Sequence, residues 1–317
     1  MINTMKILVT GATGRIGRHL VAALLEEGET VRILAREPEK AKELWGTAVE
    51  IVTGDVMNNA AVVDAVKGAD IVYHLAAMIS YDVSREALFA VNVEGTKNVL
   101  EAARGKRIIC LSSTSVYGKH TMGKNGGHTI TEEDAFAPTD LYGESKAEAD
   151  TMARAAGAVV IRPAFVYGPG FSEGVTKLFE LISKKKMVVA GEGTNRIQWT
   201  HVDDLVSALL LARRNGRGGE AYVVVSDDVK TQLEMLELIA RLLEAPVPRI
   251  HVPIFALKTV GSLIAKKAYI GTFASDRYFD CSKAKKDLNW QPKVVFEEGM
   301  KDLVDEYFLG RKFAQKK

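Results

Sequence analysis

In the first half of the chain, short apolar runs alternate with stretches of helical periodicity. The first run, residues 5–9, has strand length and leads directly into a glycine-rich turn. In residues 18–28, apolar side chains return every three or four positions, which predicts an amphipathic helix. Further strands are predicted at 30–36, 49–55, 70–77, 106–113 and 158–163. This alternation predicts an α/β fold with a Rossmann-type, doubly wound parallel sheet.

Beyond residue 170 the alternation weakens and the predicted elements become shorter. Helices are predicted at 38–45, 85–104, 142–157, 173–185, 231–244, 282–288 and 297–309, and late strands at 187–190 and 222–226. Residues 117–140 are rich in glycine, which predicts a long loop of a length that is often functional. We expect residues 1–170 to form the first domain, to which segments from about 197–226 return. Residues 171–317 would then form most of a small α/β cap that binds the substrate.

The turn after the first strand carries Gly11, Gly14 and Gly17, each three positions from the next. Gly11 would permit the tight turn, Gly14 a close approach to a pyrophosphate, and Gly17 the packing of helix on strand. Because the following helix presents free N–H groups, this turn predicts a dinucleotide site. A turn that binds nothing is the alternative, which its place at the first strand–helix junction argues against. The other residues expected around the cofactor are Thr13, Ile16, Val56, Leu75, Ala76 and Ala77.

The end of the second predicted strand bears on the choice of cofactor. An NAD site of this fold commonly has an acidic residue there, but this chain has Arg36. Arg36 could bind a 2′-phosphate, with Arg15 from the glycine turn as a second cation. We therefore expect NADP to be preferred and NAD to be possible, although both arginines could simply be solvated. Asp55 ends the third strand, where it could meet the adenine amino group or cap the next helix.

Charge and composition narrow the classes of partner and compartment. Among 317 residues the net charge is +2, which argues against a nucleic-acid partner or an anionic membrane surface. No apolar run approaches the ~20 residues that span a bilayer, and the first residues do not resemble a signal peptide. The two cysteines cannot make a disulfide framework, so a cytoplasmic, reducing compartment is expected. The six histidines are scattered, so no metal site is expected.

Tyr142 and Lys146 lie four positions apart on a predicted helix and therefore share one face. A lysine cation beside a phenol lowers the phenol pKa from about 10, which suits general acid–base catalysis. A hydroxyl at the end of a neighbouring strand would complete such a site, and Ser113 is the best candidate. The Tyr-x-x-x-Lys pattern alone is weak, but together with the glycine turn it becomes specific.

In these patterns the chain resembles the extended short-chain dehydrogenases/reductases, in the NAD-dependent epimerase/dehydratase group. The resemblance covers nearly the whole chain in order. The matching motifs are TGATGRIG (10–17), HLAA (74–77), NVEGT (92–96), SSTSVYG (112–118), YGESK (142–146), RP (162–163), YGPG (167–170), HVDD (201–204) and DCSKAKKDLNWQP (280–292).

The resemblance implies roles for particular residues. Tyr142 would be the acid/base, Lys146 would hold the nicotinamide ribose and tune Tyr142, and Ser113 would orient the reacting oxygen. The Asn92 position would support the site through backbone hydrogen bonds, or alternatively only pack inside its helix. Pro163 would lie beside the nicotinamide. The resemblance also implies a homodimer that pairs the helices at 85–104 and 142–157. The second of these offers small side chains for close helix approach, unless its alanines pack on the parent sheet: Ala147, Ala149, Ala153, Ala155 and Ala156.

Departures from the family pattern favour one branch over others. Thr114 and Ser115 stand where the family's dehydratases carry an acidic pair, which disfavours dehydration. Residues 272–279 replace a glycine-turned epimerase segment, and Arg277 there could bind a diphosphate or be a surface arginine. Residues 222–278 look more like the dihydroflavonol-reductase and 3β-hydroxysteroid-dehydrogenase branches. The apolar stretch at 253–264 would suit a less polar substrate or serve as cap core.

These patterns together predict an oxidoreductase that interconverts a secondary alcohol and a ketone by hydride transfer. Tyr142 would move the hydroxyl proton, and the substrate would be a small molecule that the sequence does not identify. A nucleotide-sugar 4-epimerase, which returns the hydride to the opposite face, is the main alternative. A non-catalytic NADP(H) sensor is a third, which the intact Ser113, Tyr142 and Lys146 argue against.

Overall fold

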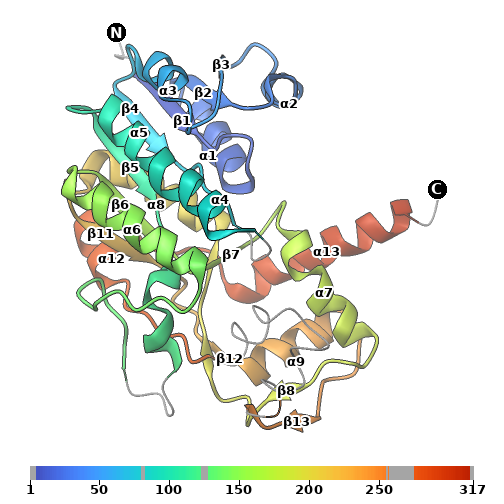
Figure 1. Cartoon of the computed structure of the whole chain (residues 1–317). Helices are drawn as coiled ribbons and strands as arrows, with labels where there is room; N and C mark the ends of the chain where they lie inside the picture. The colour runs from blue at the N-terminus through green and yellow to red at the C-terminus, as the bar shows by residue number, and fades with distance from the viewer. Residues whose placement is uncertain (1–4, 80–82, 123–127, 255, 257–274, 315–317) are drawn as a thin grey trace.

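The centre of the molecule is a seven-stranded parallel sheet with the order β11-β6-β5-β4-β1-β2-β3. The computed structural model describes residues 5–79, 83–122, 128–254, 256 and 275–314 (Figure 1). The strands are β1 (Lys6–Thr10), β2 (Thr30–Ala35), β3 (Glu50–Thr53), β4 (Ile71–His74), β5 (Arg107–Leu111), β6 (Val159–Pro163) and β11 (Ala221–Val224). The expected doubly wound α/β fold is confirmed, and the strand order reverses between β1 and β4.

Helices cover both faces of the sheet. They are α1 (Arg15–Glu26), α2 (Pro38–Trp45), α3 (Asn59–Val66), α4 (Arg85–Phe89), α5 (Gly95–Ala102), α6 (Leu141–Ala155), α8 (Val202–Asn215) and α12 (Ser282–Leu288). In β1, Ile7 and Val9 pack into the apolar cluster that includes α1 and α8, whereas Leu8 packs into the cluster that includes α3 and α5. Since neighbouring strand residues point to opposite faces, a strand apolar throughout is buried on both sides.

A second group of elements lies below the sheet in Figure 1, and we refer to it as the cap. In the described residues, its helices are α7 (Ser172–Ser183), α9 (Gln232–Leu242) and α13 (Phe296–Ala314). Three two-stranded pairs accompany them: β7 (Phe165–Tyr167) with β10 (Trp199–His201), β9 (Arg196–Ile197) with β12 (Lys230–Thr231), and β8 (Val189–Ala190) with β13 (His251–Val252). Both α8 and β11 return to the central sheet, so cap and sheet are interleaved in sequence.

Two segments in the first half of the chain differ from the predicted elements. The helix predicted at 85–104 is three pieces, because a π-helical turn, η1 (Ala90–Glu94), separates α4 from α5. The loop predicted at 117–140 begins within a 3₁₀ helix, η2 (Thr114–Met122). Most of the apolar stretch at 253–264, and residues 272–274 of the epimerase-like segment, lie outside the described residues.

Candidate active site

The glycine turn joins β1 to α1 with backbone packing that side chains would prevent. Gly11 has a φ of +71°, and a Cβ there would lie 2.6 Å from the backbone nitrogen of Ala76. A Cβ on Gly17 would lie 2.2 Å from the Gly11 carbonyl oxygen. Gly14 is the N-cap of α1, and no acidic residue occupies the first turn. The residues of this turn therefore fit a diphosphate, because the start of α1 presents backbone N–H groups and no acidic side chain lies in its first turn.

The two arginines expected at the 2′-phosphate have different partners. Arg36 is exposed, and its Nε lies 3.7 Å from an oxygen of the Asp55 carboxylate. The Arg15 guanidinium instead lies over the ring of Phe171, 5.5 Å from its centroid, just beyond β7. The Arg15 guanidinium therefore faces the segment that follows β7.

Asp55 does not cap the following helix, which corrects one of its two expected roles. The side chain of Asn58 is the N-cap of α3 and accepts the Ala61 N–H. Asp55 instead accepts the N–H of Met57 within the preceding turn. Its carboxylate faces Arg36 at the ends of β2 and β3, since both residues follow neighbouring strands.

The segment after β4 forms another side of the candidate site. Leu75 is buried, Ala76 is half-buried and Ala77 is exposed, so the chain opens toward solvent along this segment. Asn92 anchors the residue that follows them: its Oδ1 accepts the Met78 N–H at 2.7 Å, and its Nδ2 donates to the Met78 carbonyl at 3.0 Å. Of the other residues expected around the cofactor, Thr13 and Ile16 are half-buried, and Val56 and Pro163 are buried.

Three candidate catalytic residues come from β5 and α6. Ser113 follows β5 and is half-buried, with its Oγ accepting the Ser115 N–H at 3.1 Å. Lys146 is buried, and its Nζ donates to the carbonyl of Leu111, the last residue of β5, at 2.6 Å. Tyr142 lies one helical turn before Lys146 and is half-buried. The Lys146 contact therefore fixes α6 against the strand end that leads to Ser113.

The charge of Lys146 is held in an apolar setting. Burial lowers the Lys146 pKa, and nearby Cys110 and Asp150 oppose this effect. An ammonium in such a setting acts strongly on a neighbouring phenol, because the local dielectric is low. This arrangement can stabilise the phenolate form of Tyr142 and so support proton transfer.

Behind this site lies an ion pair that the sequence analysis did not single out. Arg162 and Asp150 are fully buried, and the guanidinium donates to both carboxylate oxygens at 2.9 and 2.7 Å. Arg162 also donates to the Tyr117 hydroxyl at 2.5 Å. Asp150 stands four positions after Lys146 on α6, a spacing that was visible in the sequence. That Arg162 is its partner could not be predicted, because no local sequence pattern shows which strand residue a helix residue will contact.

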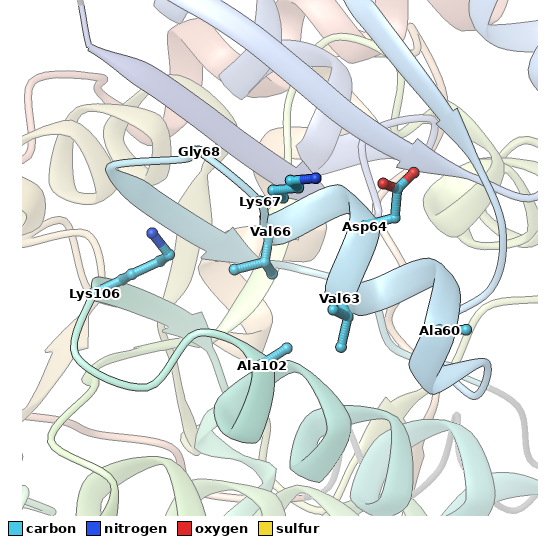
Figure 2. A pocket seen from close by; sticks show the side chains of 8 residues that line it. All are labelled: Ala60, Val63, Asp64, Val66, Lys67, Gly68, Ala102 and Lys106. Carbon is cyan, nitrogen blue, oxygen red and sulfur yellow. The ribbon is translucent and has the colours of Figure 1, made fainter.

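A separate open pocket of about 430 Å³ lies far from these residues in the fold. Its lining comes from α3, the end of α5 and the turns before β4 and β5, as Figure 2 shows. Those turns mark the amino-terminal edge of the sheet, whereas the glycine turn and Ser113 follow strand ends at the carboxyl edge. Ligands of open α/β sheets bind at the carboxyl edge, whereas this pocket lies at the opposite edge. Among the described residues, no three His, Cys, Asp or Glu side chains are grouped to hold a metal ion.

The profile of the NAD dependent epimerase/dehydratase family matches residues 7–225, which is most of the chain and includes the glycine turn, Ser113, Tyr142 and Lys146. The chain belongs to this family. The expected family is thereby confirmed, and the protein is an NAD-dependent enzyme of the extended short-chain dehydrogenase type.

Named relatives of this epimerase/dehydratase family member cover nearly its full length. Mus musculus sterol-4-alpha-carboxylate 3-dehydrogenase, decarboxylating, is 28% identical over 97% of this chain and 92% of its own. Vibrio cholerae UDP-glucose 4-epimerase is 30% identical over 95% of each chain. A crystal structure of dTDP-glucose 4,6-dehydratase from Bacillus anthracis in complex with NAD is 26% identical, with a TM-score of 0.77 over 98% of both chains. The family member is therefore similar to dehydrogenases, epimerases and dehydratases alike.

Proposed function

We propose that this protein is an oxidoreductase that interconverts a secondary alcohol and a ketone, with NADP preferred over NAD. The observation that carries the proposal is the buried Lys146, held against the end of β5 one turn from Tyr142. The glycine turn at the neighbouring strand end supplies a place for the dinucleotide. The dehydrogenase among its relatives supports a net oxidoreduction.

In this proposal each residue has a defined task. The backbone around Gly11, Gly14 and Gly17 would hold the dinucleotide, whose nicotinamide supplies or accepts hydride when bound. Tyr142 gives its hydroxyl proton to the substrate oxygen in reduction and takes it back in oxidation. Lys146 stabilises the phenolate left after proton transfer, and the Ser113 hydroxyl orients the substrate oxygen.

The pairing of Arg196 in the cap favours a substrate without a diphosphate. Arg196 makes a two-pronged ion pair with Asp276, and its guanidinium lies 4.3 Å from the Tyr278 ring centroid. The adjacent Arg277 donates its backbone N–H to the Arg196 carbonyl. Because the positive charge of Arg196 is matched within the chain, this part of the cap offers an anionic substrate less attraction.

A nucleotide-sugar 4-epimerase remains the second candidate, since the Vibrio cholerae relative is an epimerase. Such an enzyme restores its cofactor in every cycle, whereas a net reductase must exchange it. Native mass spectrometry of the purified protein separates the two. Retained NAD would favour the epimerase, and an empty or NADP-exchangeable site would favour the reductase. Binding of NADP(H) with no hydride exchange on any substrate would favour a sensor.

We further propose a homodimer that pairs α4, α5 and α6 between two copies. Arg85 of α4 and Glu144 of α6 form an ion pair at 2.5 Å that joins these helices within one chain. Of the α6 alanines, Ala149 and Ala153 pack inside the chain, whereas Ala155 and Ala156 are exposed and available to a second copy.

A cytoplasmic location is also proposed, with the two unpaired, buried thiols of Cys110 and Cys281 in support. No helix in the described part of the chain has the length and apolar character to cross a bilayer.

Tyr142→Phe tests the catalytic proposal, because it deletes one hydroxyl and keeps the ring. A panel of ketones and secondary alcohols with NADP(H) absorbance as readout first identifies a substrate. On that substrate, kcat should fall by about 10²–10⁴-fold while NADPH affinity is retained. Tyr222→Phe is the matched control, since its hydroxyl accepts the Arg217 N–H at the far edge of the sheet. Near-normal turnover of Tyr142→Phe would show that another group carries the proton.

A further inference from the structure

A chain of buried hydrogen bonds connects the end of β1 to the π-helical turn. Thr10, directly before Gly11, has its Oγ1 2.8 Å from His74 Nδ1. On the other side of the ring, His74 Nε2 lies 2.9 Å from Thr96 Oγ1. All three side chains are at most 4% exposed. The imidazole therefore joins β1 to α5, two elements that are separated in sequence.

The hydrogen-bond partners at both ends determine which atom donates and which accepts in each of these hydrogen bonds. Thr96 Oγ1 donates to the Asn92 carbonyl at 2.7 Å, so it accepts the proton of His74 Nε2. His74 Nδ1 then accepts from the Thr10 hydroxyl, whose oxygen accepts the Ala76 N–H at 3.4 Å. Burial, together with the nearby Lys146 charge, lowers the His74 pKa to about 3, so the ring is neutral at physiological pH. The neutral tautomer with the proton on Nε2 gives each of these three side chains a donor or acceptor for every hydrogen bond just described.

The Thr96 side of the chain ends at the catalytic helix. Asn92 lies in the π-helical turn, a distortion that is frequent at functional sites. Its Nδ2 donates to Ser145 Oγ at 2.9 Å, and Ser145 in turn donates to the Tyr142 carbonyl at 2.8 Å. A change at Thr96 therefore acts on the backbone of Tyr142 through only two intervening side chains.

The Thr10 side ends at the cofactor turn. Thr10 binds the Ala76 N–H through its side chain and the Leu75 N–H through its carbonyl. Gly11 packs against the backbone of the same two residues. This half of the chain therefore fixes the ends of β1 and β4, the two strands at the point where the sheet order reverses.

We propose that His74 is a positioning residue with two separable effects: its Nδ1 side sets the geometry of the dinucleotide turn, and its Nε2 side sets the position of Tyr142. The inference rests on the proposed function for the identity of the ligand and of the proton carrier. A purely structural histidine would affect both sides together, through stability alone.

Two substitutions separate the halves. In His74→Asn, the side-chain amide takes the place of Nδ1 and keeps an acceptor for the Thr10 hydroxyl. In His74→Gln, the longer side chain brings its amide to the place of Nε2 and keeps a donor to Thr96. NADPH fluorescence titration measures the first half. Tyrosine ring-carbon NMR, with the Tyr142 resonance assigned from Tyr142→Phe, measures the second half without requiring a substrate.

The expected result is a crossed pattern. His74→Gln should raise the NADPH Kd by about two- to tenfold, as expected for one lost hydrogen bond, and leave the Tyr142 resonance in place. His74→Asn should shift the Tyr142 resonance and its titration midpoint while the Kd stays within about twofold of wild type. Thr10→Val should raise the NADPH Kd as His74→Gln does, and Thr96→Val should shift the Tyr142 resonance as His74→Asn does. These two variants test the inference if a histidine variant fails to fold.

Thr176→Val is the matched control, because its Oγ1 makes the same bond to a carbonyl four residues earlier, on α7 of the cap. It should change neither readout. Equal changes of both readouts in both histidine variants, or no change in either, would overturn the inference. If wild-type protein binds no dinucleotide, the cofactor half of the proposed function fails, and the Tyr142 shift in His74→Asn still tests the Nε2 half.

Discussion

Arg36 illustrates how much one exposed side chain can decide about cofactor choice. It stands directly after β2, with 68% of its side chain exposed and the Asp55 carboxylate as its neighbour. A carboxylate at this position would accept hydrogen bonds from a ribose diol and repel a 2′-phosphate. An arginine reverses that preference, because its planar donors match phosphate geometry and its charge is permanent.

Arg36→Asp should therefore weaken NADP binding far more than NAD binding. Charge-assisted hydrogen bonds are worth about 1.5–3 kcal/mol, and solvent exposure places Arg36 toward the low end. Wild type should then bind NADP about tenfold or more tightly than NAD. Calorimetric titration of both cofactors into both proteins measures the difference.

Arg104→Asp supplies the matched control, because it makes the same charge change on an exposed residue after α5. It should leave the ratio of the two affinities unchanged. Equal affinity of wild type for NAD and NADP would remove the NADP assignment and strengthen the epimerase alternative.

At the scale of elements, α6 combines the candidate chemistry with its mechanical support. One helical turn after Tyr142 comes Lys146, and one turn later Asp150, which the fully buried Arg162 of β6 neutralises. The same guanidinium lies 4.8 Å from the Phe136 ring centroid and bonds to Tyr117 of η2. Arg162 thus ties the helix of Tyr142 to the segment that follows Ser113.

Arg162→Met should lower the free energy of unfolding by about 3–5 kcal/mol, since it leaves the Asp150 charge buried without its partner. The double variant with Asp150→Leu should recover part of that loss, because no buried charge remains. Urea unfolding measures all three proteins.

Arg241→Met provides the comparison, since its pair with Glu297 is more than half exposed on both sides. Its cost should be about 0–1 kcal/mol. A cost of similar size for Arg162→Met would mean that the buried pair contributes no more than a surface pair.

At the scale of the whole molecule, the helix layer of α4, α5 and α6 would meet its copy in the proposed dimer. Light scattering at micromolar concentration should give twice the mass of one chain. Ala155→Arg places a charged side chain on the exposed end of α6 and should shift the protein toward monomer. Ala60→Arg makes the same change on exposed α3 and should not. A monomeric wild type would contradict the dimer.

Acid stability is also a property of the whole fold. The His74 pKa is depressed to about 3 in the folded state, so the unfolded chain takes up a proton first, near its ordinary value of about 6.5. Stability from neutral His74 is therefore present above that value and is lost as the pH falls from it toward the folded pKa.

Between those two pH values, the free energy of unfolding should fall by up to about 1.4 kcal/mol per pH unit through this one group. This slope corresponds to the uptake of about one proton on unfolding. Urea unfolding at several pH values below neutrality measures the slope, and His74→Gln should flatten it. An unchanged slope in that variant would assign the proton uptake to other groups.

The amino-acid sequence by itself determined the order and type of most elements, because side-chain periodicity is a local property. It also determined the glycine turn, whose conformation requires residues without a Cβ, and the spacing that puts Tyr142 and Lys146 on one helix face. These features depend on neighbours within a few positions, so they are visible without a fold.

The tertiary structure alone decided which distant residues meet. It paired His74 with Thr10 and Thr96, and Arg162 with Asp150. It also placed the Arg15 guanidinium over the ring of Phe171. Each of these contacts joins different strands, helices or loops, and a buried polar group takes whichever partner the packing brings within hydrogen-bond distance. That partner follows from the fold as a whole, and no local pattern encodes it.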